Sequence, residues 1–166
     1  MTHGLKFMEG YKVLPLVAPV DITATATATP YFDLDKLNWA TLAIHWGAVT
    51  ACDLSTVTLE VSTAAASNAT EVAIGFQYRL SVAVDTDDSA AGTITTATST
   101  GVANTATDDG KVLFVEVDPQ AVAAVGTDYR FCRAVITPDA GTGAQIVGVV
   151  MFGEPRYPGN AIPSAT

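Results

Sequence analysis

The sequence KVLFVEVD at residues 111–118 repeats with a period of two: Leu113, Val115 and Val117 lie on one side of an extended chain, opposite a side that includes Glu116. This period is typical of a β-strand, because successive side chains point to opposite faces of a sheet. The aliphatic set has no polar member, so we expect Leu113, Val115 and Val117 to face the core.

Two further stretches show the same alternation, but with apolar residues on both faces. They are LNWATLAIHW at residues 37–46 and DYRFCRAVIT at residues 128–137. A strand that is apolar on both faces is either central in a covered sheet or buried by a neighbouring subunit. We therefore expect interface residues on these strands and in the closing segment GEPRYP. The candidates are Trp39, His45, Trp46, Phe131, Arg133, Arg156 and Tyr157.

Other strand candidates follow at the spacing of an all-β sandwich or barrel. The repeat DITATATATPYF, residues 21–32, predicts a strand whose inner face carries Ile22 and the alanines at 24, 26 and 28, with the threonines outside. The remaining candidates span residues 11–17, 38–46, 56–62, 71–78, 80–84, 93–98, 111–117, 128–137 and 145–152. Turn-rich pieces with Gly, Pro, Asp or Asn separate many of them.

One short helix is expected near residues 119–125, in VDPQAVAAVGTD. Asp118 suits the N-cap, Pro119 suits the first helical position, and Gly126 suits a left-handed C-terminal cap.

The chain of 166 residues is 49% hydrophobic and only 15% charged, which argues against disorder. This length suits one domain, and we expect a single sandwich over residues 1–166. The terminal segments, about residues 1–20 and 153–166, are rich in proline and lack periodicity. We expect them to be extended arms that order on a partner.

Charge and hydropathy exclude several classes of partner. The chain has 17 acidic residues against 8 Lys and Arg, a formal net charge of −9, and no segment gathers basic residues. We therefore expect neither nucleic acid nor an anionic membrane as a partner. No apolar run is long enough for a transmembrane helix. The start, MTHGLKFMEGYKVL, carries charges where a signal peptide is apolar, so we expect synthesis in the cytoplasm.

The sequence offers little for catalysis or metal binding. The only histidines are His3 and His45, and no nucleophile elbow, P-loop or zinc-binding motif is present, so we expect a non-enzymatic protein without a cofactor. The cluster Asp85, Asp87 and Asp88 is a calcium candidate, although solvated turn carboxylates would give the same pattern.

Two cysteines and a few aromatic residues leave alternatives open. We expect Cys52 and Cys132 to be reduced thiols, while their pairing stays undetermined by the sequence. Aromatic side chains could stack on sugar rings, which keeps a carbohydrate-binding module as an alternative. The candidates for such stacking are Trp39, Trp46, Tyr78 and Tyr157.

An ordered series of segments over roughly residues 37–158 resembles small virion proteins of tailed bacteriophages that are encoded beside the major capsid protein. The series comprises an early strand ending at Gly47, VTLEV at 57–61, an F-x-Y at Phe76 and Tyr78, TDDGKVLFVEVDP at 107–119, YRFCR at 129–133, and GEPRYP at 153–158. The two cysteines, Cys52 and Cys132, neither support nor oppose this resemblance.

The resemblance implies a jelly roll or related β-sandwich that decorates or cements the head shell, without catalytic residues. It implies the major capsid protein as a partner, a position on the capsid exterior, and self-association, as a trimer before a dimer. A tail or head-fibre component is the alternative within virions, and an adhesive or carbohydrate-binding sandwich is the alternative outside them. Alternation by itself leaves the strand order open, because jelly-roll and immunoglobulin-like sandwiches share it.

Overall fold

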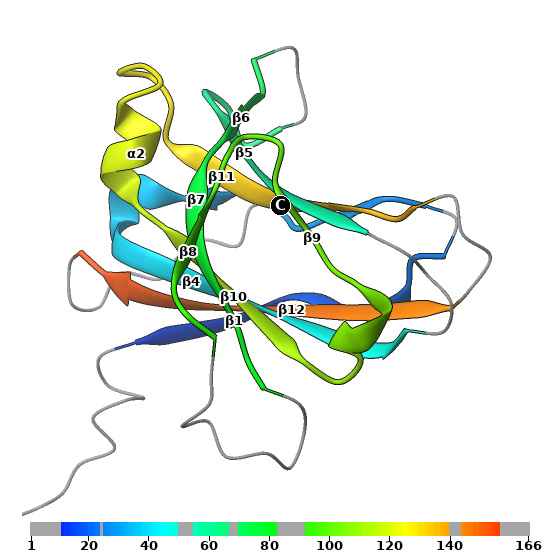
Figure 1. The fold of residues 1–166 in the computed structure, drawn as a ribbon. Coiled ribbons are helices and arrows are strands. Elements are labelled where there is room, and N and C mark those ends of the chain that lie inside the picture. The colour runs from blue at the N-terminus through cyan, green and yellow to red at the C-terminus, as the bar shows by residue number, and fades with distance from the viewer. Residues whose placement is uncertain are drawn as a thin grey trace, which may run out of the picture.

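The protein is a β-sandwich of two antiparallel sheets (Figure 1). The computed structural model describes residues 11–23, 25–49, 55–66, 70–82, 92–139 and 144–156. Sheet A has the order β1-β12-β4-β10-β7-β8, and sheet B has the order β2-β11-β5-β6, with β3 paired to β11 and β9 paired to β5.

The strand bounds are as follows. In sheet A they are β1 Lys12–Asp21, β12 Gln145–Pro155, β4 Leu37–Val49, β10 Val112–Val117, β7 Phe76–Leu80 and β8 Thr95–Ala97. In sheet B they are β2 Thr27–Ala28, β3 Phe32–Asp33, β11 Phe131–Thr137, β5 Thr56–Ser62, β6 Val72–Ile74 and β9 Val102–Ala103. Short 3-10 helices, η1 Leu34–Lys36 and η3 Ala106–Asp108, precede β4 and β10.

The connections are those of a jelly roll. The chain passes from β1 in sheet A to β2 in sheet B, then to β4 in A, to β5 and β6 in B, to β10 in A, to β11 in B and to β12 in A. The strands β1-β12-β4-β10 therefore face β2-β11-β5-β6, which is the jelly-roll order. The pair β7–β8 is inserted after β6 and extends sheet A beyond β10.

The core includes the inward set that alternation predicted for β10. Leu113, Val115 and Val117 of β10 are buried, while Glu116 between them is exposed. Every second residue of β4, β5, β11 and β12 contributes to the same cluster. The most deeply buried of these include Leu42, Ile44, Trp46, Val57, Leu59, Ala134, Ile136, Val149 and Met151.

The Thr/Ala repeat forms much less strand than its pattern predicted. Among its described residues between Ile22 and Pro30, only Thr27 and Ala28 belong to a strand, β2, which pairs with β11. Its faces also differ from the prediction, because Ala26 and Ala28 are exposed while Thr29 is buried. Thr29 Oγ1 accepts a hydrogen bond from the N–H of Ala134 at 3.0 Å. A buried hydroxyl with a backbone partner costs little, so this partner outweighs the preference for alanine inside.

Part of each predicted arm belongs to a β-strand. Residues 12–20 belong to β1, which pairs with β12 from Lys12↔Gly153 to Asp21↔Ile146. Residues 153–155 likewise belong to β12. Pro15 and Pro19 are tolerated because β1 is an edge strand and pairs only along one side. Residues 1–10 and 157–166 lie outside the described residues.

The predicted helix is confirmed as α2, Pro119–Ala123. The Asp118 carboxylate caps it by accepting a hydrogen bond from the N–H of Gln120 at 2.8 Å. The expected left-handed cap at Gly126 is wrong, because the only positive-φ glycines among the described residues are Gly101 and Gly110. No helix in the described part of the chain has the length and apolar character needed to cross a bilayer.

Gly75 divides the predicted strand 71–78 between the two sheets. β6 before it pairs with β5 in sheet B, and β7 after it pairs with β10 in sheet A. A Cβ atom at position 75 would lie 2.7 Å from the carbonyl oxygen of Ala97. The crossing therefore leaves no room for a side chain, because β8 passes against the backbone.

Gly101→Ala should destabilise the protein by about 2–3 kcal/mol. Gly101 has a φ of +84°, and a Cβ there would lie 2.2 Å from the carbonyl oxygen of Val57. The control is Gly148→Ala, where the nearest atoms lie 3.5 Å or farther from the added Cβ. Urea unfolding should show a change below about 1 kcal/mol for the control. Equal effects of the two substitutions would contradict the steric explanation.

Asp108→Asn should reduce stability at pH 7 by about 1–2 kcal/mol and have less effect in acid. Burial raises the pKa of Asp108, but hydrogen bonds from Thr105 and Lys111 outweigh it and lower the pKa below its ordinary value. The carboxylate's contribution is therefore present above the unfolded-state pKa of about 4 and is lost as the pH falls through the lower folded-state pKa. Urea unfolding from pH 7 to pH 2.5, roughly spanning that window, measures it. The exposed Asp109→Asn is the charge-matched control.

Candidate interaction surface

The outward side of sheet A mixes apolar and acidic side chains. Cross-strand partners share a face, so the register identifies its members. We call it the A face. Its outward residues are Val13, Pro15, Trp39, Thr41, Ala43, His45, Gln77, Arg79, Val112, Phe114, Glu116, Val150, Phe152 and Glu154.

The A face changes from apolar to polar across the sheet. One row of partners runs from β1 to β7, and the next row runs in parallel and reaches β8. The first row is Pro15, Val150, Ala43, Phe114 and Arg79; the second is Val13, Phe152, Thr41, Glu116, Gln77 and Thr96. The β1–β12 side is thus aliphatic and aromatic, whereas the β7–β8 side carries charges and amides. Such a gradient suits a protein contact, which combines an apolar centre with a polar rim.

Two of the candidate interface residues, Trp39 and His45, lie on the A face. Trp39 is half-buried, and its ring centroid lies 5.5 Å from that of Tyr11. His45 is exposed. Trp46 is not on the A face, because its side chain is fully buried in the core. The alternation of β4 separates it from its neighbour His45.

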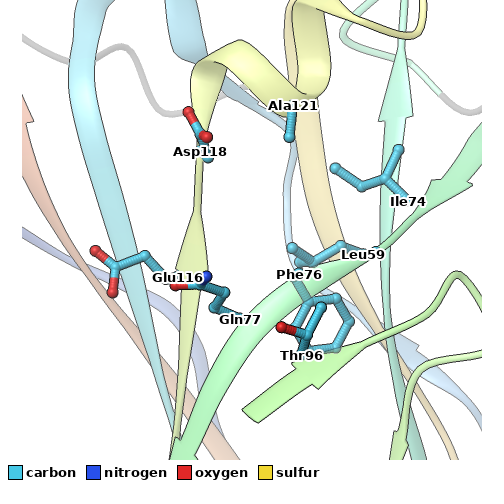
Figure 2. A pocket seen from close by; sticks show the side chains of 9 residues that line it. Leu59, Ile74, Phe76, Gln77, Thr96, Glu116, Asp118 and Ala121 are labelled. Atoms are coloured by element: carbon cyan, nitrogen blue, oxygen red, sulfur yellow. The ribbon is translucent and has the colours of Figure 1, made fainter. Parts of the chain in front are cut away.

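A hollow of about 270 Å³ opens beside the A face, where the chain crosses from β6 to β7 (Figure 2). Leu59, Ile74 and Phe76, which are core residues, line its apolar side together with Ala121 of α2. Glu116 and Asp118 line the opposite side, as Figure 2 shows. Gly75, Gln77 and Thr96 complete the lining. We call this space the crossing hollow.

A second hollow of about 280 Å³ lies on the A face itself. Its lining includes Phe114 and Ile94, and the side chain of Ile94 is 66% exposed. Arg79 and Thr41 add polar groups. Glu116 and its cross-strand partner Gln77 line both hollows, so they stand between them. We call this second space the face hollow.

The outward side of sheet B is occupied by internal ion pairs. Arg133 binds Glu60 at 2.8 Å and Glu71 at 2.9 Å. Its guanidinium lies 4.8 Å from the centroid of the Tyr31 ring, and the Tyr31 hydroxyl donates to Glu71. Burial and this hydrogen bond raise the pKa of Tyr31 above its ordinary value. The structure thus commits Arg133, a candidate interface residue, to contacts within the chain.

The other candidate residues are not brought together. Phe131 lies under the guanidinium of Arg130 at 4.8 Å, on the sheet B side. Arg156 is exposed after β12, and its backbone N–H donates to the carbonyl of Lys36 at 2.8 Å. Tyr157 and the calcium candidates Asp85, Asp87 and Asp88 lie outside the described residues. Within the described ranges, no three His, Cys, Asp or Glu side chains are grouped closely enough to hold a metal ion.

Cys132 is a free, fully buried thiol whose pKa is raised by burial and by the charge of Glu60. It is therefore held neutral and packs as a small apolar side chain. Cys52 lies outside the described residues.

Sequence reasoning missed Val13, Val150, Phe152 and Glu116 as surface candidates. A signal for two of them was present in QIVGVVMFGEP at residues 145–155, where Val150 and Phe152 alternate with the buried Val149 and Met151. The role of Glu116 had no local signal, since it depends on the hollows that several strands form together.

Comparisons with known proteins give little. No protein-family model matches the chain, and no curated protein matches it. Two solved chains from infectious bursal disease virus are similar at a low level. The Gx strain chain has a TM-score of 0.25 and 9% identity, over 88% of this chain and 40% of that one. The Gt strain chain has a TM-score of 0.23 and 10% identity, over 88% and 41%. The protein thus spans about two fifths of their length, and similarity this low carries no functional argument.

Arg133→Leu should destabilise the protein by about 1–3 kcal/mol, because it leaves the carboxylates of Glu60 and Glu71 without their shared cation. Adding Glu60→Gln should recover part of the loss by removing one uncompensated charge. Urea unfolding of both variants at neutral pH measures this. A loss below about 0.5 kcal/mol for Arg133→Leu would contradict a structural role for the cluster.

Proposed function

We propose that this protein is a non-enzymatic structural component of a bacteriophage virion, most specifically a capsid decoration protein that binds and stabilises the head shell. The proposal draws its virion context from the resemblance of residues 37–158 to phage proteins encoded beside the major capsid protein. It draws its mode of action from the A face. A decoration protein needs a docking surface and no active site.

The observation that carries the docking role is the apolar half of the A face. Val13 is 38% exposed, and Val150, Phe152, Ala43 and Trp39 beside it are only half-buried. Contiguous apolar side chains on one face mark an interaction site, whereas isolated ones are ordinary. At one end of this face the ring of Tyr11 lies 5.5 Å from that of Trp39, centroid to centroid.

The partner in this proposal is the major capsid protein on the capsid exterior. We further assign a homotrimer, with a dimer as the alternative, because capsid lattices offer threefold and quasi-threefold positions. A tail or head-fibre position is the alternative within the virion, and copy number per virion distinguishes it.

The test is cosedimentation of the purified protein with expanded heads that lack it, followed by image reconstruction of the pellet. We expect saturable binding at lattice sites and heads that withstand higher temperature. Absence of binding by the folded protein would overturn the decoration role.

The double variant Val150→Lys/Phe152→Lys should weaken head binding at least about tenfold, because it places two charges in the apolar half of the A face. Thr58→Lys is the matched control, since Thr58 pairs with Val135 in sheet B and is half-buried. Thermal melting checks that both variants fold. Equal binding by the two variants would show that the A face is not the contact.

A further inference from the structure

We propose that the crossing hollow receives one basic side chain, an arginine in preference to a lysine, from a protein partner. This rests on the proposed docking function and names the chemistry of the partner at this part of its surface. The hollow adjoins the A face through Glu116, which belongs to both.

The carboxylates at the crossing hollow have no ion-pair partner within the described part of the chain. Glu116 and Asp118 are both exposed, and none of the described residues that line this hollow is a Lys, Arg or His. No described basic side chain forms an ion pair with either carboxylate. Arg79 lines the face hollow, which Glu116 also lines, and not the crossing hollow.

The side of the crossing hollow opposite these carboxylates is apolar. Leu59 is fully buried, and Ile74 and Phe76 are 8% and 5% exposed, so the hollow reaches the edge of the core. An inorganic cation makes no favourable contact with this apolar side of the hollow. A long basic side chain fits both sides, because its aliphatic stem packs on apolar surface while its charged head stays with the carboxylates.

The lining of the crossing hollow also offers hydrogen-bonding groups to a ligand. One Asp118 oxygen accepts from the N–H of Gln120, which leaves the other oxygen for a ligand. Gln77 and Thr96 add an amide and a hydroxyl to the lining. A guanidinium has several donors in a fixed plane and can bind two acceptors at once, whereas an ammonium is a point charge. This favours arginine.

The size of the hollow suits a single side chain. Gly75 lines it and has no side chain to fill it. A volume of about 270 Å³ suits one side chain and its neighbours better than a drug-sized ligand.

The direct test uses Nα-acetyl-arginine amide as the probe and Nα-acetyl-citrulline amide as its neutral isostere. Amide NMR spectra of the wild-type protein should show millimolar binding of the arginine probe, by about the affinity expected for so small a ligand. Shifts should concentrate at Gly75, Gln77, Thr96 and Ala121. The citrulline probe should bind at least about threefold more weakly.

Glu116→Gln should weaken the arginine probe about threefold to tenfold. Glu154→Gln is the matched control, because Glu154 is a carboxylate on the same face, opposite Trp39 and outside both hollows. Equal effects of the two substitutions, equal binding of the two probes, or shifts confined to other residues would overturn the proposal. Stronger shifts at the hollow with methyl glucoside would instead assign a sugar site.

Head binding separates this inference from the proposed function. Glu116→Gln should weaken binding to heads and reduce its dependence on salt, while Glu154→Gln should not. If heads bind the protein but neither the probe nor Glu116→Gln has an effect, the hollow inference fails and the docking role stands. If the arginine probe binds at the hollow but heads do not bind, the decoration role fails and the hollow keeps its chemistry.

Discussion

Strand β4 hydrogen-bonds along both edges, to β12 and to β10, and the rest of the structure depends on this central position. Its alternation places Leu42, Ile44 and Trp46 in the core with no exposed surface. The same alternation places Trp39 and His45 on the A face. A shift of one residue in register would exchange these sets. The core and the candidate interaction surface are therefore fixed by one constraint, and neither can change without the other.

The two outward faces of the sandwich differ in whether their carboxylates form ion pairs. On sheet B, Arg133 holds Glu60 and Glu71, and the Tyr31 ring lies beside its guanidinium. On sheet A, Glu116 lines both hollows beside apolar side chains, and its carboxylate forms no ion pair with another described residue. A satisfied network stabilises the fold, whereas an unpaired carboxylate near apolar surface leaves binding energy for a partner. This difference is why the docking and arginine proposals both concern sheet A.

The local sequence pattern predicted the core-facing residues of β10, where an aliphatic set lies opposite a set that includes Glu116. It did not predict them for β4, where both sets are apolar and Trp46 was an interface candidate. Local patterns also failed in the Thr/Ala repeat, because threonine and alanine are close in size and either can be buried when its polar group finds a partner, as Thr29 does with Ala134. They also missed the change of sheet at Gly75, since the reason is the passage of β8 against that backbone. Of the candidate interface residues, Trp39 and His45 lie on the A face, while Trp46 is in the core.

The sequence by itself determined an all-β protein with a short capped helix, an acidic surface, and strands that are apolar on both faces. These properties are local, because side-chain alternation, capping and composition need no knowledge of distant residues. Only the tertiary structure decided which strands are neighbours, which side chains share the A face, and that Glu116 and Asp118 line one hollow with Gln77 and the core residue Leu59. Those relations join segments far apart in the chain, and a period-two pattern carries no information about its partner strand.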